Sequence, residues 1–275
     1  NTHSINQQLN DFEKKSGFVL NTEQRQAVAI TASNTFSIIT GGAGTGKTTV
    51  LEALYQTYDK LGIKIQQMAL SGRATKRMIE ATGREATTIA GFLHNIKTAH
   101  FNKNTVIVID EASMVDVGTM YRILKHIPPE TRIVLVGDAG QLPPIGAGLV
   151  LHTLLHNKNI PVTELKVVNR HGGMIAKVAT SIREGIWLDL PENIDDEICF
   201  ISCSRDDLIK NILSLYTMYY EDNSNVQILE PIKKGSFFGT THTNKYCQEL
   251  LADKDKLIKI QNQEFDVPEA LAIRE

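Results

Sequence analysis

A glycine-rich run connects a short apolar segment with a segment of helical periodicity. Small residues let backbone N–H groups approach an anion closely, and the helix that follows directs its positive end at the same point. Lys47 would reach the β- and γ-phosphates of a nucleoside triphosphate, and the Thr48 hydroxyl would bind Mg²⁺. The run, together with Thr49 after it, therefore predicts a binding site for a nucleoside triphosphate and Mg²⁺. Its residues are Gly41, Gly42, Ala43, Gly44, Thr45, Gly46, Lys47 and Thr48.

Two acidic residues follow another apolar run. Val106–Ile109 is typical of a buried strand, and Asp110 and Glu111 come directly after it. Open parallel sheets bind ligands at the carboxyl ends of their strands, so we expect both carboxylates at the same edge as the glycine-rich run. Asp110 is predicted to hold the Mg²⁺ and Glu111 to polarise an attacking water. An Asp-Glu pair alone is common at the exposed start of a helix. Beside a phosphate-binding loop, the same pair predicts hydrolysis of the bound nucleotide.

A third loop, Gly137–Pro144, follows the apolar segment Arg132–Val136. Because it also lies at the carboxyl end of a strand, Gln141 could face the γ-phosphate and report whether it is present. The two prolines restrict the loop, which suits a part that transmits a change of state. The sequence therefore predicts catalytic roles for Lys47, Glu111 and Gln141.

The elements that must position these loops alternate along the chain. Apolar runs alternate with helical patterns from Phe36 to Leu165, which predicts a parallel α/β sheet with helices on both faces. The N-terminal stretch 5–30 is predicted to be helical, with a break at Ser16-Gly17. The expected strands are Phe36–Thr40, Ile63–Leu70, Thr105–Ile109, Arg132–Val136 and Val162–Leu165, and the expected helices are Lys47–Leu61, Arg73–Ala81, Gly118–His126 and Gly148–Leu155.

The alternation restarts after Arg170 and predicts the beginning of a second α/β domain. The expected helices there are Met174–Glu184, Asp206–Tyr220 and Thr241–Ala252, and the expected strands are Ile198–Ser202 and Val226–Glu230. The predicted organisation is a helical segment over 1–30, a first α/β domain over 31–168 and a partial second domain over 169–275.

The composition excludes several other classes of protein. The sequence is 42% hydrophobic and 22% charged with a formal net charge of −2, so any contact with DNA must come from a local groove rather than an overall basic surface. It has no apolar run of about 18 residues and no basic, apolar start, which predicts a cytoplasmic protein outside the membrane. Three cysteines favour a reducing compartment, and Cys199 and Cys203 are interpreted as buried thiols rather than metal ligands.

Together the three loops resemble motifs I, II and III of the RecD-like superfamily 1 DNA helicases, a resemblance that extends over about residues 20–251. It implies two RecA-like domains. Leu20–Val28 is similar to the family's Q motif, which implies that Gln24 contacts the adenine edge. Leu165–Arg170 resembles the motif whose arginine reaches the γ-phosphate from the second domain, which implies that Arg170 is a transition-state finger.

The same resemblance implies a track for single-stranded DNA. Ser71–Arg77 resembles motif Ia, Glu85–Ile89 resembles motif Ib, and Gln227–Gly235 is similar to a DNA-facing loop of the second domain. The implied activity is ATP-driven movement on single-stranded DNA, 5′ to 3′, in recombination or repair. The candidate DNA contacts are Arg73, Lys76, Thr88, His94, Lys233 and Lys234.

The sequence departs from the family's pattern at three points. Ala90 and Gly91 replace a common His-Arg pair, a form closer to conjugative relaxase helicases, and His171 replaces a glutamine. No run in the sequence resembles motif V or motif VI. The resulting hypothesis is that the sequence is part of a longer protein, and that this part binds ATP but turns it over slowly and does not translocate.

Two other interpretations remain open. The sequence could be the helicase portion of a conjugative relaxase, which an upstream domain with a nucleophilic tyrosine and a histidine-rich metal cluster would distinguish. It could also be a nucleotide-driven effector that binds a protein partner, which stimulation by protein instead of DNA would reveal. Motifs Ia and Ib favour DNA.

Overall fold

The structure is a computed structural model of the 275-residue chain. It describes residues 2–96, 101–167, 173–194, 196–221, 226–235, 239–251, 257–260 and 263–266. The chain forms two compact units, Asn1–Leu188 and Asp189–Glu275. The predicted domain boundary after residue 168 stays a prediction. Within the described residues, no helix is long and apolar enough to cross a membrane.

Unit 1 is built on a six-stranded sheet in which every paired strand is parallel to its neighbour. The order across the sheet is β3-β2-β4-β5-β1-β6, so that β1 and β4 lie on either side of β5. All the carboxyl ends therefore meet at one edge of the sheet. The strands are β1 Phe36–Gly41, β2 Lys64–Ala69, β3 Ala86–Thr88, β4 Thr105–Asp110, β5 Arg132–Gly137 and β6 Val162–Leu165.

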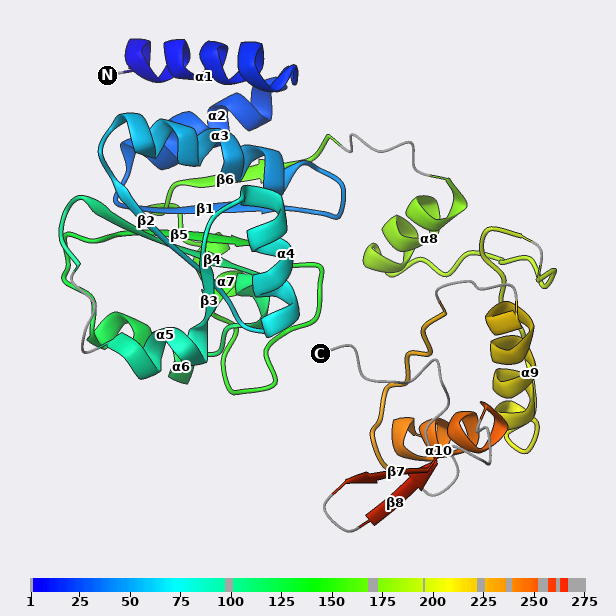
Figure 1. Cartoon of the computed structure of the whole chain (residues 1–275). Coiled ribbons are helices and arrows are strands. Elements are labelled where there is room, and N and C mark those ends of the chain that lie inside the picture. The colour runs from blue at the N-terminus through cyan, green and yellow to red at the C-terminus, as the bar shows by residue number, and fades with distance from the viewer. Residues whose placement is uncertain are drawn as a thin grey trace. The chain divides into compact units, whose positions relative to one another are not determined.

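Helices cover both faces of this sheet (Figure 1). One apolar core contains side chains of the first four helices, and a second contains side chains of the next three. The helices of unit 1 are α1 Thr2–Ser16, α2 Thr22–Ser33, α3 Lys47–Lys60, α4 Gly72–Thr82, α5 Ile89–Asn95, α6 Val117–Lys125, α7 Val150–Leu155 and α8 Met174–Arg183, with a short 3₁₀ helix, η2, over Ala112–Met114.

Strand β4 shows why an uninterrupted apolar run was needed. Val106 and Val108 point into the first core, whereas Ile107 and Ile109 point into the second, and all four are fully buried. Successive side chains of a strand face opposite ways, so a strand covered on both faces must be apolar at every position. This arrangement fixes the end of β4, and with it Asp110, at the carboxyl edge.

The predicted α/β fold of unit 1 is confirmed. All five predicted strands form, and the helical break at Ser16-Gly17 is present, with Gly17 at a φ of 70°. The sixth strand, β3, was not predicted because three residues carry too little periodicity to distinguish a strand from a loop. It pairs with β2 over Gln67–Ala69.

The described residues of unit 2 contain two helices, α9 Leu208–Glu221 and α10 Thr240–Leu251, and an antiparallel pair, β7 Leu257–Ile260 with β8 Gln263–Asp266. Both helices were predicted. The predicted strands Ile198–Ser202 and Val226–Glu230 are wrong, since neither segment has regular structure. Leu229 is 82% exposed. An apolar run becomes a strand only where a neighbouring strand accepts its hydrogen bonds, and the described part of the chain offers these two segments none.

The prediction that Cys199 and Cys203 are buried thiols is also wrong. Cys203 is exposed and Cys199 is half-buried, while Cys247 is buried. Because residues 198–202 do not enter a sheet, nothing there covers Cys203 in the way the apolar run suggested.

Candidate nucleotide-binding site

The glycine-rich loop joins the end of β1 to the start of α3. Gly44 and Gly46 adopt left-handed φ angles of 77° and 84°, which an L side chain disfavours. A Cβ on Gly41 would lie 2.7 Å from the carbonyl oxygen of Leu165, the last residue of β6. The loop closes on itself through Thr45, whose hydroxyl donates to the Gly42 carbonyl at 2.9 Å. The predicted loop therefore forms, and glycine is required for both its turn and its close packing.

Lys47 folds back across this loop. Its Nζ donates to the carbonyl oxygens of Gly41 at 2.6 Å and Gly42 at 2.9 Å. Burial lowers the pKa of Lys47, and the negative charges of Asp138 and Asp110 oppose that shift. The ammonium is therefore held in place over the loop, between the backbone that would surround a phosphate and the carboxylates of the next two loops.

Asp110 lies at the end of β4, where the sequence predicted a metal ligand. Burial raises its pKa, and the backbone N–H of Glu111 and the charge of Lys47 act in the opposite direction. That N–H donates to Asp110 Oδ1 at 2.8 Å. Burial makes the charged form of a carboxylate costly, and a bound divalent ion offsets that cost by neutralising the charge.

Glu111 has an unusual backbone, with φ 52° and ψ 37°. Among the described residues it is the only non-glycine with a positive φ. This conformation costs an L residue about 1–2 kcal/mol, and such strain concentrates at functional sites. Burial and then the charge of Asp110 raise the pKa of Glu111, while Arg77 lowers it. The strained turn carries the carboxylate past the end of the strand, beside Asp110.

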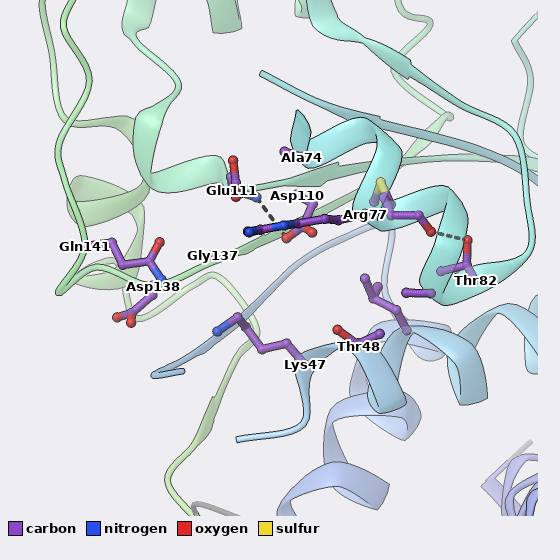
Figure 2. A pocket seen from close by; sticks show the side chains of 13 residues that line it. Lys47, Thr48, Ala74, Arg77, Thr82, Asp110, Glu111, Gly137, Asp138 and Gln141 are labelled. Carbon is purple, nitrogen blue, oxygen red and sulfur yellow. Dashed lines mark hydrogen bonds between the residues drawn. The ribbon is translucent and has the colours of Figure 1, made fainter. Parts of the chain in front are cut away.

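One cavity of about 200 Å³ lies between these groups, at the carboxyl edge of the sheet. Figure 2 shows Lys47 reaching in from the start of α3, Asp138 and Gln141 on the other side, and Arg77 extending from α4 toward Asp110 and Glu111. The lining residues are Lys47, Thr48, Leu51, Ala74, Arg77, Met78, Ala81, Thr82, Asp110, Glu111, Gly137, Asp138 and Gln141.

The structure thus brings together five of the predicted site residues, Lys47, Thr48, Asp110, Glu111 and Gln141, around one cavity. These groups fit a nucleoside triphosphate with Mg²⁺. Mg²⁺ is commonly held by one or two carboxylates together with substrate phosphates and water, so it needs no dedicated protein cage. No group of three or more His, Cys, Asp or Glu side chains gathers anywhere in the described residues.

Gln24, predicted to contact adenine, is buried behind the loop. Its side chain accepts the Asn21 N–H at 3.0 Å and donates to the Thr45 carbonyl at 3.4 Å. The first bond is half of a capping box that begins α2. The amide therefore connects the start of α2 to the phosphate loop, and its contact with adenine stays a prediction.

The predicted DNA contacts lie in both units. Arg73 and Lys76 are exposed on α4 and His94 is exposed on α5, while Thr88 is half-buried at the start of α5. The Thr88 hydroxyl accepts the Gly91 N–H at 3.0 Å, so its own hydrogen is available to an acceptor. Lys233 and Lys234 are exposed in unit 2. Arg170, the predicted finger, lies outside the described residues.

Three charged residues of the site were not singled out from the sequence. Arg77 and Asp138 belong to motif-like runs but line the cavity only because α4 and β5 direct them there. Arg183 ends α8 and forms an ion pair with Asp138 at 2.8 Å. A separation of 45 residues gives no sequence signal for such a pair.

Comparison with known proteins identifies the family. Residues 19–192 match the model of the AAA domain. The chain belongs to the AAA-domain family. The ATP-dependent RecD2 DNA helicase of Deinococcus radiodurans is 30% identical over 262 residues, covering 91% of this chain and 35% of that protein. The RecBCD enzyme subunit RecD of Mycolicibacterium smegmatis is 35% identical over 196 residues, covering 59% of this chain and 35% of that protein.

These relatives confirm the resemblance to RecD-like superfamily 1 proteins. The chain spans about a third of the length of either relative, 35% in both cases. The crystal structure of the Pif1 helicase from Candida albicans matches the fold with a TM-score of 0.50 at 19% identity, over 77% of this chain and 56% of that one. The RecA-like class of the predicted α/β sheet is thereby confirmed for this AAA-domain protein.

Proposed function

We propose that this chain binds and hydrolyses ATP as the nucleotide-binding part of a RecD-like DNA helicase that moves on single-stranded DNA. The observation that carries the proposal is the meeting of Lys47, Thr48, Asp110, Glu111 and Gln141 around one cavity at the carboxyl edge of the sheet. The similarity to the ATP-dependent RecD2 DNA helicase of Deinococcus radiodurans supports the same assignment.

The proposed mechanism gives each loop one task. The backbone N–H groups of the glycine-rich loop hold the phosphates, and Lys47 neutralises charge on the β- and γ-phosphates. Glu111 accepts a proton from the attacking water, for which a raised carboxylate pKa is suited because the base is then stronger. Gln141 orients that water or the γ-phosphate from the loop after β5.

Thr48 and Asp110 are the residues that would hold Mg²⁺. When bound, the ion supplies positive charge to the phosphate oxygens during transfer. We assign to Arg170 the role of transition-state finger, on the resemblance of its motif, and to Gln24 a contact with adenine. The direction of movement that the resemblance implies is 5′ to 3′.

The proposed DNA track runs over the same edge of unit 1. Strands β2 and β3 end side by side, with Ala69 opposite Thr88 in the parallel register. The exposed Arg73 and Lys76 follow the first of these ends. A local group of cations can bind the phosphate backbone even though the net charge of the chain is −2. Lys233 and Lys234 are the candidates in unit 2.

The proposal is tested by measuring ATP binding and turnover of the chain with Lys47→Ala. Loss of a charge-assisted contact to phosphate should weaken ATP binding by about tenfold or more. Lys125→Ala, on the exposed surface of α6, is the matched control and should leave binding unchanged. Equal ATP binding by the Lys47→Ala variant and the parental chain would contradict the proposal.

Turnover with and without single-stranded DNA tests the coupling separately. The double variant Arg73→Ala/Lys76→Ala should weaken binding of a single-stranded oligonucleotide while leaving ATP binding intact. Lys14→Ala/Lys15→Ala, at the end of α1, removes the same charge elsewhere. Equal DNA binding by the two double variants would exclude α4 from the track, and stimulation by a protein instead of DNA would favour an effector.

A further inference from the structure

Arg183, the last residue of α8, reaches across to the loop after β5. Its guanidinium binds the Asp138 carboxylate through both oxygens, with Nη2 at 2.8 Å from Oδ1 and Nη1 at 3.2 Å from Oδ2. This two-pronged geometry is the strongest form of an arginine–carboxylate pair. Both residues belong to unit 1, so the contact is internal to one compact body.

The two partners differ in their surroundings. The Asp138 side chain is 5% exposed, whereas that of Arg183 is 41% exposed. Asp138 Oδ1 also accepts the Gly140 N–H at 2.9 Å. A buried carboxylate needs a partner to offset its desolvation, but a half-exposed arginine has no such need. The pair therefore satisfies Asp138 while leaving the other face of the guanidinium open.

That open guanidinium lies against the phosphate loop. A Cβ placed on Gly42 would come within 3.0 Å of Arg183 Nη1, and one on Gly140 within 2.5 Å of Nε. Two glycines, one in each loop, thus provide the space that Arg183 occupies. Its charge is close enough to Lys47 to lower the pKa of that ammonium.

We propose that Arg183 is a second cation of the nucleotide site, which contacts the terminal phosphate of a bound nucleoside triphosphate and through Asp138 reports its presence to the loop after β5. This inference rests on the proposed function, because it assumes that ATP occupies the glycine-rich loop. Arginine has five N–H donors in a planar fork, so it can keep Asp138 and still donate to a phosphate oxygen.

The alternative is that Arg183 only neutralises Asp138 and so removes a negative charge that would repel any phosphate. The two roles separate when Asp138 is made neutral. In an Asp138→Asn background the neutralising role is gone, and any remaining dependence on Arg183 must come from its own contact with the nucleotide.

The experiment measures affinities of ADP and of the non-hydrolysable analogue β,γ-imido-ATP, both with Mg²⁺, by calorimetry on the 275-residue chain. The variants are Asp138→Asn, Arg183→Ala/Asp138→Asn and Arg183→Lys. Arg122→Ala, an exposed arginine of α6, is the control. Thermal unfolding of each variant is recorded, so that a loss of folding is not mistaken for a loss of binding.

In the Asp138→Asn background, removal of Arg183 should weaken binding of the triphosphate analogue by about tenfold or more, as the loss of one charge-assisted hydrogen bond does. Binding of ADP should weaken by less than about threefold. Arg183→Lys should retain part of the preference for the triphosphate. Equal weakening of both nucleotides, or no change in either, would overturn the inference. If the parental chain binds neither nucleotide, or if Lys47→Ala leaves binding intact, the proposed function fails and this inference with it.

Discussion

The loop after β1 and the loop after β4 meet at the same sheet edge but are built in opposite ways. Residues 42–46 make a relaxed turn in which glycines take the positive φ angles and Lys47 has carbonyl partners at 2.6 and 2.9 Å. At the end of β4, a glutamate takes the positive φ itself, beside an aspartate whose pKa burial has raised. We propose that the first loop binds the anion, whereas the second loop holds a strained glutamate whose pKa is raised.

This difference separates binding from chemistry. A group that binds ground state and transition state equally changes affinity, whereas a group that acts only in the transition state changes turnover. We therefore expect substitutions in the loop after β1 to act on ATP affinity, and substitutions at Glu111 to act on rate and on folding stability.

The largest effect on ATP affinity is expected from Gly41→Ala. Its new Cβ would lie 2.7 Å from the Leu165 carbonyl oxygen, a backbone atom that cannot move without displacing β6. Overpacking of this kind costs about 1–3 kcal/mol, and the displaced loop should lose about 10- to 100-fold in ATP affinity. Binding of ATP, followed by calorimetry, measures it.

Gly72→Ala is the control for that substitution, since a Cβ there would meet nothing within 4 Å. It should bind ATP as the parental chain does. An unchanged affinity in Gly41→Ala would mean that the loop tolerates a side chain and is not preorganised.

The pH dependence of turnover should report on the second loop. Glu111 acts as a base only when it is deprotonated, so the rate falls as pH drops below its pKa, by about tenfold per pH unit. Burial and Asp110 raise that pKa above the ordinary value of 4.5, which moves the acid limb to higher pH. Arg77→Ala removes the charge that lowers it, and the limb should move higher still. A limb that moves to lower pH in this variant would contradict the assignment.

The smallest expected effect concerns folding. At an ordinary helical position a protein with glycine is less stable than one with alanine. At a position with a left-handed backbone, the glycine variant is the more stable of the two. Glu111→Gly should therefore be more stable than Glu111→Ala by about 1 kcal/mol, measured from urea unfolding midpoints. An alanine variant as stable as the glycine variant would show that the φ of 52° at Glu111 carries no strain.

Sequence patterns predicted the parts of the site that depend on local chemistry. The spacing of Gly41, Lys47 and Thr48 requires one turn at one strand end, and the apolar run before Asp110 requires burial on both faces, so both could be inferred without a structure. Arg77 and Arg183 could not, because their positions depend on how α4 and α8 pack. The strain at Glu111 could not be predicted either, since nothing in an Asp-Glu pair indicates a left-handed backbone.

The fold divides in the same way. Unit 1 was predictable because each apolar run found a parallel neighbour, as β4 did between β2 and β5. The runs at 198–202 and 226–230 are also rich in apolar residues, yet they form no strand in the described part of unit 2. A strand needs a neighbouring strand for its hydrogen bonds, and the residues of one segment do not determine whether that neighbour is present. Prediction of strands from a single sequence therefore fails where the neighbour is missing.

The substitution Glu111→Gln, with ATP affinity and ATP turnover measured on the same sample, separates nucleotide binding from hydrolysis at this site. Glutamine keeps the shape of the side chain but cannot accept the proton from water. We expect parental affinity for ATP together with a loss of turnover of about 10²- to 10⁴-fold, while Glu130→Gln, an exposed control, leaves both unchanged. Turnover at the parental rate in Glu111→Gln would contradict the assignment of the cavity as a site of ATP hydrolysis with Glu111 as its base.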